Sequence, residues 1–468
     1  MFIKQFYTPC LSEAAYYIES EGEVAIIDPL RDTEAYVQLA AERNATIKYI
    51  FETHFHADFV SGHLDLANQT GAPIIYGPVA NTDYNIVSAR DGEIFKLGKL
   101  SIEVLHTPGH TLESSCFLLI DEEDIARAIF TGDTLFVGDV GRPDLSSGEM
   151  TSGELAGIMY ETLHAKILPL ADDVIVYPAH GPGSSCGKNL GPDTSSTIGK
   201  EKQSNYALQP QTKEDFIKAV TDGLGTAPKY FAVNAKINQQ GYAKLTEVIE
   251  KGTTALAVNG FKEVMAQADV IVLDTRPAVE FTQGFIPGSI FIGLEGRFAE
   301  WAGSLLPFDK KLLLVTPKGK EEESVIRLAR VGFEKMAGHL DGGFDAWKAA
   351  GEATDIIIDV EADELMMDIP FDEHLVVVDV RKETEFGEGH LENALNVPLS
   401  EMTDVVNLAQ FEDNQNLYVH CAGGYRSVIA SSLLKREGIH NLRNVLGGWG
   451  KIKEQEKAII VKEANVLN

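Results

Sequence analysis

Cysteine is scarce in this chain, with 4 residues among 468. Widely spaced cysteines do not form the dense disulfide framework that stabilises small secreted domains. The first residues also lack the charged, apolar and small-residue regions of a signal peptide. Both absences argue against a secreted scaffold, and we expect the protein to work in the reducing cytoplasm.

Long apolar runs and an excess of positive charge are missing as well. No segment approaches the run of about 18 apolar residues that a membrane-spanning helix needs. The 70 acidic residues outnumber the 40 basic ones, which gives a formal net charge of −30. That sign disfavours nucleic acid and anionic membrane surfaces, and we expect neither as a partner. With 44% hydrophobic and 24% charged residues, the composition indicates a soluble globular protein of about three domains.

One of the cysteines, Cys421, lies between a predicted strand and a predicted helix. The apolar run 417–420 precedes it, and residues 427–435 carry the apolar spacing of a helix. A cysteine at such a turn faces backbone N–H groups and the positive end of a helix, and both favour the thiolate. The alternative interpretation is a buried structural cysteine beside a glycine turn.

The residues that follow Cys421 are suited to holding an anion. Gly423 and Gly424 let the backbone close around it, and Arg426 adds a fixed positive charge. The segment 421–426 resembles the active loop of rhodanese sulfurtransferases, in which the cysteine carries sulfur as a persulfide. Cysteine phosphatases have a longer spacing between cysteine and arginine, so the sequence favours sulfur transfer over phosphate chemistry.

An internal repeat with an offset of 105 residues occupies the C-terminal half. Each copy alternates short β-branched strands with helical patterns, which is typical of a parallel sheet flanked by helices. Both copies resemble rhodanese domains. The shared motifs are Asp-x-Arg (274–276 and 379–381), Glu-Phe (280–281 and 385–386) and Gly-Gly (342–343 and 447–448) with a nearby tryptophan (Trp347 and Trp449).

The first copy lacks the reactive cysteine. Thr316 stands at the position of Cys421, and the loop 317–323 after it is longer and carries three acidic residues. A hydroxyl has no thiolate character at neutral pH, and clustered carboxylates repel a bound anion. We therefore predict that the first copy is catalytically silent and serves as a spacer or docking surface.

The N-terminal half carries histidines and aspartates at points where a predicted strand or turn ends. A His-x-His-x-Asp run just past a strand places alternate polar side chains on one side of the chain, as a metal site requires. The residues of the set are His54, His56, Asp58, His110, Asp133 and His180. Together they resemble the metallo-β-lactamase superfamily, whose fold is an αββα sandwich of two sheets with helices outside.

Phe59 departs from the superfamily pattern. Two-metal hydrolases of this fold have a histidine directly after the aspartate of the first motif, and phenylalanine cannot ligate a metal. His63 lies four residues later, which makes it a poor replacement. Two histidines and one carboxylate with open positions remain, and this donor set suits oxygen-activating non-haem Fe(II) better than hydrolytic zinc.

Persulfide dioxygenases, a branch of that superfamily, use such a site, and the chain resembles them. The resemblance implies one Fe(II) per chain, ligated by His54, His110 and Asp133. The other superfamily positions are then expected to surround the metal or to face the substrate, namely His56, Asp58 and His180.

Two further residues are candidate substrate contacts. Arg142 lies in the segment 138–145, which resembles the dioxygenase branch. It is expected near the iron, where it could hold a carboxylate of a thiol substrate; a surface ion pair is the alternative. Cys186 lies in the glycine-rich segment 180–189, which resembles bacterial dioxygenase–rhodanese fusions. It could hold or relay sulfur, or be an ordinary small loop residue.

We predict three domains, a persulfide dioxygenase domain of metallo-β-lactamase fold (1–257), an inactive rhodanese-like domain (258–355) and an active rhodanese domain (356–468). The predicted activity oxidises a low-molecular-weight thiol persulfide with O2 to sulfite, coupled through Cys421 to thiosulfate, in sulfide detoxification.

Two other hypotheses stay open. One is a glyoxalase-II-like thioester hydrolase, with zinc, joined to a sulfur-carrier rhodanese domain, against which Phe59 argues. The other is a non-catalytic sulfur-binding or sensing protein built on degenerate enzyme folds. The sequence identifies neither the thiol nor the direction of sulfur flow, and it leaves a homo-oligomer open.

Overall fold

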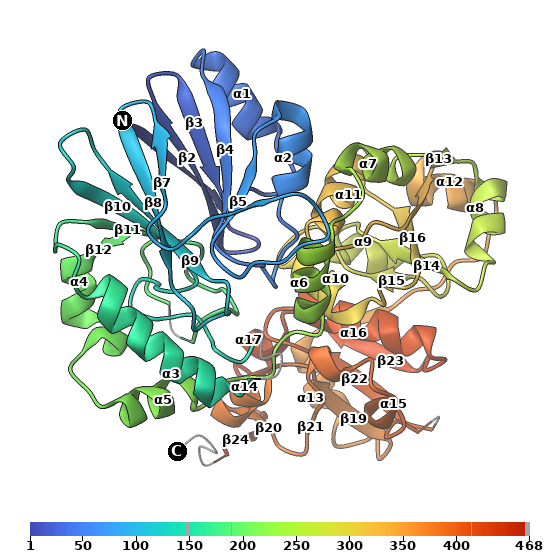
Figure 1. Cartoon of the computed structure of the whole chain (residues 1–468). Coiled ribbons are helices and arrows are strands. Elements are labelled where there is room, and N and C mark those ends of the chain that lie inside the picture. Colours follow the sequence, from blue (N-terminus) through green and yellow to red (C-terminus); the bar gives the residue numbers. More distant parts are fainter. Residues whose placement is uncertain (146–149, 189, 413, 464–468) are drawn as a thin grey trace. The chain divides into compact units, whose positions relative to one another are not determined.

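The computed structural model describes residues 1–145, 150–188, 190–412 and 414–463. These form two compact units, one made of Met1–Glu247 with Leu328–Glu334 and the other of Val248–Arg327 with Lys335–Asn468. Figure 1 follows both units along the chain. The first unit holds the candidate metal residues, and the second holds both copies of the repeat.

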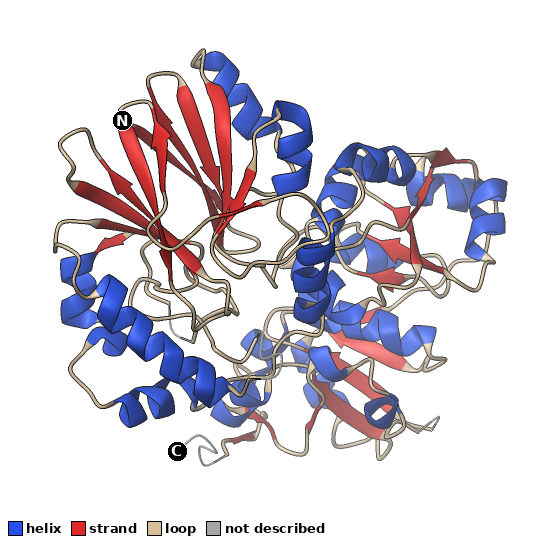
Figure 2. Ribbon diagram, viewed as in Figure 1, coloured by secondary structure: helices blue, strands red, loops and turns tan. Residues whose placement is uncertain are grey.

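Two six-stranded sheets pack face to face in the first unit, and helices cover their outer sides (Figures 1 and 2). The predicted αββα sandwich is therefore confirmed. One sheet has the order β1 (Phe2–Thr8), β2 (Glu13–Ser20), β3 (Glu23–Ile27), β4 (Thr46–Glu52), β5 (Ile74–Tyr76), β6 (Val87–Ser88). The other has the order β12 (Ser196–Thr197), β11 (Ile175–Pro178), β10 (Ala126–Gly132), β9 (Ser115–Ile120), β8 (Leu100–His106), β7 (Ile94–Leu97).

Helices of the first unit follow these strands in the chain. They are α1 (Glu34–Glu42), α2 (His63–Thr70), α3 (Ser152–Thr162), α4 (Ile198–Ser204), α5 (Lys213–Thr221) and α6 (Phe231–Gln240), and α7 (Leu245–Gly252) leads into the second unit. Short turns η1 (Leu163–Ile167) and η2 (Tyr206–Leu208) extend α3 and follow α4.

Strand β2 shows why its sheet is buried on both faces. Successive side chains of a strand point to opposite faces of its sheet. Tyr16 and Ile18 therefore lie between the two sheets, whereas Ala15 and Tyr17 pack on the helical side with Ala40 of α1. Both faces are buried, so the strand reads as an almost continuous apolar run.

Strand ends bring the candidate metal residues to one edge of the sandwich. Strands β4, β10 and β11 end one or two residues before His54, Asp133 and His180, and β8 ends shortly before His110. The β3–β4 and β10–β11 pairs are parallel, so the loops that follow them leave each sheet on the same side. The fold thus gathers side chains that are far apart in the sequence.

The second unit contains two five-stranded parallel sheets of identical connectivity, which confirms the two rhodanese-type copies. The first has the order β13 (Ala255–Leu256), β17 (Met336–Leu340), β16 (Lys311–Val315), β14 (Val270–Asp274), β15 (Ile290–Phe291). The second has the order β18 (Ile358–Val360), β23 (Leu442–Val445), β22 (Asn416–His420), β19 (Leu375–Asp379), β21 (Leu395–Asn396). β20 (His390–Leu391) and β24 (Ile460–Val461) form a further pair.

The helices of the two copies also correspond. Those of the first copy are α8 (Val258–Met265), α9 (Ala278–Gln283), α10 (Phe298–Leu305), α11 (Glu321–Ala329) and α12 (Gly343–Ala349). Those of the second are α13 (Ala362–Asp368), α14 (Glu383–Glu388), the turn η3 (Leu399–Glu401), α15 (Val405–Leu408), α16 (Tyr425–Arg436) and α17 (Gly448–Ile452).

The Asp-x-Arg motif has the same geometry in both copies. Arg276 donates to Asp274 at 2.6 Å and Arg381 donates to Asp379 at 2.6 Å. The Arg276 guanidinium lies over the Phe344 ring and that of Arg381 lies over Trp449. The counterpart of Trp449 is therefore Phe344, and not Trp347 as the motif comparison suggests.

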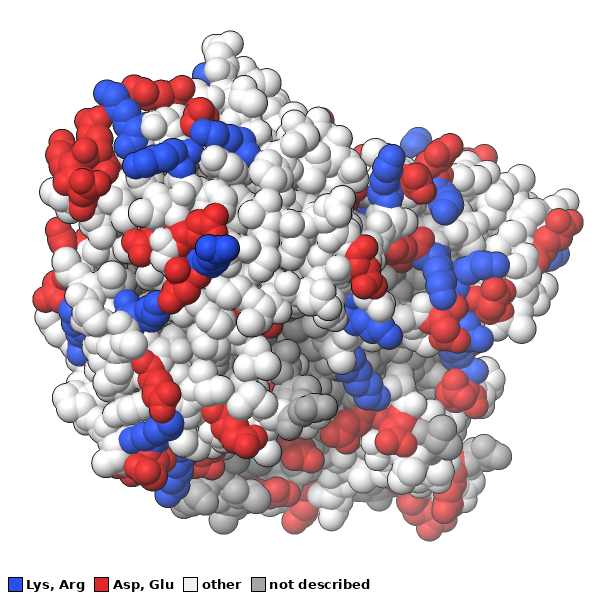
Figure 3. All heavy atoms as spheres, in the orientation of Figure 1, with Lys and Arg blue, Asp and Glu red and all other residues white. Residues whose placement is uncertain are grey.

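The acidic excess does not gather into one field on the surface drawn in Figure 3. Over the described residues of that face, acidic and basic side chains intermingle. None of the helices in the described part of the chain has the length and apolar character to cross a membrane.

Candidate metal centre and sulfur-transfer loop

Three predicted iron ligands converge on one buried point. His54 Nε2 lies 3.8 Å and His110 Nε2 lies 3.4 Å from Asp133 Oδ2. The three donor atoms lie within 4.8 Å of one another. Both oxygens of Asp133 are buried and have no hydrogen-bond partner among the described residues. A buried carboxylate is costly unless a partner compensates it, so this arrangement fits a bound cation.

The histidines are oriented as metal ligands. An oxygen atom holds the Nδ1 of each ring, which leaves the Nε2 lone pair free for a metal. The pairs are His54 with Thr53 Oγ1 (3.0 Å), His110 with the Arg142 carbonyl (2.7 Å) and His180 with the Ser12 carbonyl (3.1 Å). Burial, followed by the neighbouring histidines, lowers the pKa of His54 well below its usual range, so this ring is neutral as ligation requires.

Further donors surround the other oxygen of Asp133. His180 Nε2 lies 3.4 Å from Asp133 Oδ1 and 3.4 Å from Asp58 Oδ2. Cys186 joins this group, because its sulfur lies within 4.8 Å of the donor atoms of Asp133 and His180. Burial, followed by the charges of Asp58 and Asp133, raises the pKa of the Cys186 thiol well above its usual range.

Phe59 and His63 contribute no donor to these groups. The Phe59 ring is fully buried and its centre lies 4.3 Å from that of His56. His63 stacks on Tyr84 and lies 3.5 Å from Glu52 Oε1. Within the described part of the chain, His63 belongs to none of the groups that could hold a metal.

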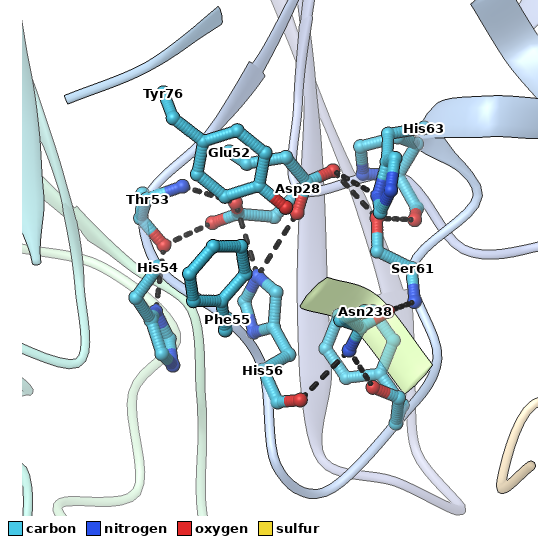
Figure 4. Close-up of polar contacts among 12 residues, drawn as sticks. Asp28, Glu52, Thr53, His54, Phe55, His56, Ser61, His63, Tyr76 and Asn238 are labelled. Carbon is cyan, nitrogen blue, oxygen red and sulfur yellow. Dashed lines mark hydrogen bonds and ion pairs between the residues drawn. The ribbon is translucent and has the colours of Figure 1, made fainter. Parts of the chain in front are cut away.

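His56 faces two carboxylates that sequence reasoning missed (Figure 4). Its Nε2 lies 3.1 Å from Asp28 Oδ1 and 3.7 Å from Glu52 Oε2. Burial opposes protonation of the His56 ring, but Asp28 and then Glu52 outweigh it and raise its pKa to about 10. His56 is also within reach of the donor atoms of Asp58 and His180. Asp28 and Glu52 each end or follow an apolar strand, as Asp133 does, and that placement is their only signal in the sequence.

Arg142 supports the centre mainly through its backbone. Its carbonyl holds His110, and its N–H donates to the Cys186 carbonyl at 3.0 Å. Its guanidinium is buried and pairs with Asp144 at 2.7 Å. It also donates to the carbonyl of Gly225 at 2.5 Å. The predicted contact with a substrate carboxylate stays a prediction.

The loop of Cys421 joins β22 to α16. The Gly424 N–H donates to Cys421 Sγ at 3.1 Å, and the thiol is buried. Gly424 has a φ of 115°, which L side chains rarely adopt, whereas Gly423 has no positive φ. The glycine that the loop conformation requires is therefore Gly424.

Arg426 is paired rather than free. It donates to the Glu385 carboxylate at 2.6 Å and 2.8 Å. The Arg426 guanidinium lowers the pKa of Glu385 below its usual value. The expected fixed charge is present, but in this structure it ties the loop to α14.

The loop of the first copy has a different form. Thr316 is buried, and α11 begins at Glu321, one residue later than α16 begins after Cys421. Glu321, Glu322 and Glu323 occupy the first turn of α11. The helix end that would face a bound anion therefore carries carboxylates.

Two family models match the chain. The model described as Metallo-beta-lactamase superfamily matches residues 8–180. The model described as Rhodanese-like domain matches residues 258–350 and 361–455.

The curated relatives of this chain include hydroxyacylglutathione hydrolases and persulfide dioxygenases. A probable hydroxyacylglutathione hydrolase of Schizosaccharomyces pombe, glo2, is 33% identical over 33% of this chain, and the match spans only 58% of that protein. The mitochondrial persulfide dioxygenase ETHE1 of Homo sapiens is 28% identical over 38% of this chain and 68% of its own length.

One solved structure matches a larger share of this chain than these two relatives do. The crystal structure of a metallo-beta-lactamase from Staphylococcus aureus subsp. aureus COL is 33% identical, with a TM-score of 0.64. The match covers 72% of this chain and 98% of that one.

Proposed function

This chain belongs to the metallo-β-lactamase superfamily and carries two rhodanese-like domains, and from that premise we propose that it is an iron-dependent persulfide dioxygenase coupled to a sulfurtransferase. Its domains are 1–257, the silent 258–355 and the active 356–468. The observation that carries the proposal is the donor set of two histidines and one carboxylate, together with Phe59 at the position where two-metal hydrolases of this fold have a histidine.

One Fe(II) fits the residues His54, His110 and Asp133, whose donor atoms are buried and close together. When bound, the ion supplies open positions at which oxygen chemistry takes place. The balanced reaction is persulfide plus O2 plus water to thiol, sulfite and two protons. The terminal sulfur is oxidised and O2 is reduced, so no further co-reactant is needed.

The chain's own residues prepare the site. The Arg142 and Ser12 carbonyls orient His110 and His180, and the buried walls keep bulk water away from the donors. In the second unit, the Gly424 N–H and the start of α16 stabilise negative charge on Cys421 sulfur. A second molecule of the thiol persulfide transfers its outer sulfur to the Cys421 thiolate and leaves as the thiol. Sulfite that attacks this outer sulfur gives thiosulfate and returns the thiolate.

Four free cysteines agree with a reducing compartment, and we infer a cytoplasmic location. The substrates that follow are a low-molecular-weight thiol persulfide and O2, with sulfite or thiosulfate as product.

Oxygen uptake tests the proposal. Protein loaded with Fe(II) under anaerobic conditions is given glutathione persulfide or cysteine persulfide and then O2. We expect one O2 consumed per persulfide when sulfite is the product, and one O2 per two persulfides when thiosulfate is the product. No oxygen uptake by iron-loaded protein, with hydrolysis of S-lactoylglutathione instead, would overturn it.

A thioester hydrolase of the glyoxalase II type is the second candidate. It is favoured by Asp58, His180 and Cys186, which supply donors beside Asp133 for a second metal even though Phe59 cannot. Metal analysis separates the two functions. One iron per chain supports the dioxygenase, whereas two metals with thioester hydrolysis support the hydrolase.

A further inference from the structure

We propose that the first rhodanese-like copy, which has no cysteine of its own, positions the Cys421 loop of the second copy. Tyr425 is the positioning residue through which the first copy acts on this loop. Both copies belong to the second compact unit, and so do all the residues that make the contact. This inference rests on the proposed sulfur transfer at Cys421, and it gives the first copy a defined role in that reaction.

Tyr425 is the first residue of α16 and directly follows the glycine that faces the sulfur. The Gly424 N–H donates to Cys421 Sγ at 3.1 Å. The Tyr425 hydroxyl donates to the Gly293 carbonyl of the first copy at 2.7 Å. The Tyr425 ring also meets the Phe291 ring edge-on, with 6.0 Å between the ring centres. The start of the helix that faces the thiol is therefore tied to the first copy.

The Gly293 carbonyl is fixed by its own copy. The Leu294 N–H donates to the Thr275 carbonyl at 3.1 Å, and Arg327 Nη1 donates to the Leu294 carbonyl at 2.6 Å. The backbone is also tightly packed here, because a Cβ added at Gly293 would lie 3.0 Å from the Arg276 carbonyl oxygen. The first copy therefore offers the tyrosine hydroxyl an acceptor at a fixed place.

Helix α16 is bound to the first copy beyond its first turn as well. It lies beside β15, the edge strand of the first sheet (Figure 1). An edge strand turns backbone N–H groups away from its own sheet. The Phe291 N–H of β15 donates to the buried Ser432 Oγ at 3.0 Å. In the last turn, Arg436 donates to the Gly288 carbonyl at 2.7 Å. The helix is thus held at its start, its middle and its end.

The repeat shows that the fold of one copy does not require an aromatic residue at this point. Lys320 stands 105 residues before Tyr425, at the offset of the repeat, and its side chain is exposed. It pairs with Glu323 of its own helix at 2.8 Å. Tyr425 therefore serves the contact between the copies rather than the folding of its own copy.

The position of this helix start matters for sulfur chemistry. A helix terminus stabilises a nearby charge only within its first turn, and a hydrogen bond weakens steeply when its angle departs from linear. Gly424 directly precedes Tyr425, so release of the tyrosine lets the Gly424 N–H move relative to the sulfur. The thiolate and the persulfide of Cys421 are then less stabilised, although the second copy stays folded.

The test uses the full chain and measures sulfur transfer from thiosulfate to cyanide. Tyr425→Phe keeps the ring and removes the hydroxyl. We expect its kcat to fall about fivefold with little change in KM, in the range of one hydrogen bond. Thiolate at neutral pH, measured as the ultraviolet absorbance difference from the matching Cys421→Ser protein, is expected to fall too. Tyr418→Phe is the matched control, because its hydroxyl bonds Asp368 at 2.5 Å within the second copy, and it should change neither readout.

A substitution in the first copy tests the same contact from the other side. Phe291→Leu removes the ring that meets Tyr425, and it is expected to lower kcat at Cys421. Phe281→Leu is its control, because Phe281 is equally buried and packs on Phe291 with 4.9 Å between the ring centres. It is expected to lower the unfolding temperature without lowering kcat. Should Phe291→Leu not fold, Ser432→Ala removes the acceptor of the Phe291 N–H and is expected to lower kcat.

Two outcomes would overturn the inference. One is a Tyr425→Phe protein that keeps both its kcat and its thiolate. The other is an equal loss in Tyr425→Phe and Tyr418→Phe that follows the unfolding temperature, which would reduce Tyr425 to a stabilising residue. Failure of the proposed sulfur transfer is a separate result, seen as Cys421→Ser protein that keeps its activity. The thiolate measurement still tests the position of the loop in that case.

Discussion

Asp133 is the residue on which the metal prediction depends most directly. Its oxygens, which have no hydrogen-bond partner among the described residues, lie between the histidines of two donor groups. An ion that binds only the folded protein stabilises it by about 2.7 kcal/mol at a hundredfold excess over its Kd. Chelation is therefore expected to lower the unfolding temperature of the first unit, as followed by calorimetry. Anaerobic Fe(II) should restore it, but not in Asp133→Asn; an unchanged unfolding temperature after complete metal removal would contradict the site.

The backbone conformation of Gly424 shapes the loop that follows Cys421. Its φ of 115° strains any L side chain, at a cost of roughly 1–3 kcal/mol. Gly424→Ala is expected to displace the N–H that faces Cys421 and to reduce thiosulfate sulfurtransferase activity at least about tenfold. Gly423→Ala is the matched control, since Gly423 has ordinary φ and open space where a Cβ would stand. Equal losses in both variants would show that the φ of Gly424 is not what matters.

Helix α6 holds the loop that carries His56 through the side chain of one residue, Asn238. The Asn238 side chain bonds three backbone groups of the loop 56–61. The side chain of Asn234 on the same helix is equally buried and has no hydrogen bond within the described residues. Unsatisfied buried groups cost about 1–3 kcal/mol each. Asn238→Ala is expected to lower both the free energy of unfolding and iron affinity, as measured by denaturant unfolding and metal titration. Asn234→Ala should lower the free energy of unfolding and the iron affinity by less. Larger losses in Asn234→Ala than in Asn238→Ala would show that the hydrogen bonds of Asn238 do not hold the loop 56–61.

Helix α6 also contains a functional side chain, Asn238, that the sequence does not predict. The metal donors could be predicted because each follows a strand or turn in a recurring pattern. Asn238 could not, because two of the buried positions of α6 are asparagines and its apolar periodicity is therefore weak. Likewise, the Asp-x-Arg repeat predicted two similar copies, but Phe344 as the partner of Arg276 required the structure. Patterns predict which element carries a residue, whereas partners across elements depend on packing.

The two rhodanese-like copies differ at the position of the proposed sulfur carrier. Cys421 is the thiol that we propose for sulfur transfer, and Thr316 offers only a hydroxyl beside a carboxylate-bearing helix start. Cys421→Ser in the intact chain is therefore expected to remove all thiosulfate sulfurtransferase activity, measured as thiocyanate formed from thiosulfate and cyanide. Activity remaining above the uncatalysed rate would assign sulfur transfer to the first copy as well.

Covalent linkage of the proposed dioxygenase site to the proposed sulfur-carrying thiol affects the product that we expect from the whole chain. Sulfite released by the first unit is a nucleophile for the outer sulfur on Cys421, and tethering raises its effective concentration near that persulfide. Thiosulfate is therefore the expected main product from persulfide and O2. Cys421→Ser should leave oxygen uptake largely unchanged and shift the product to free sulfite, as followed by oxygen electrode and ion chromatography. If the variant instead loses oxygen uptake with persulfide supplied directly, then Cys421 takes part in the oxidation, and the two sites are not separable half-reactions.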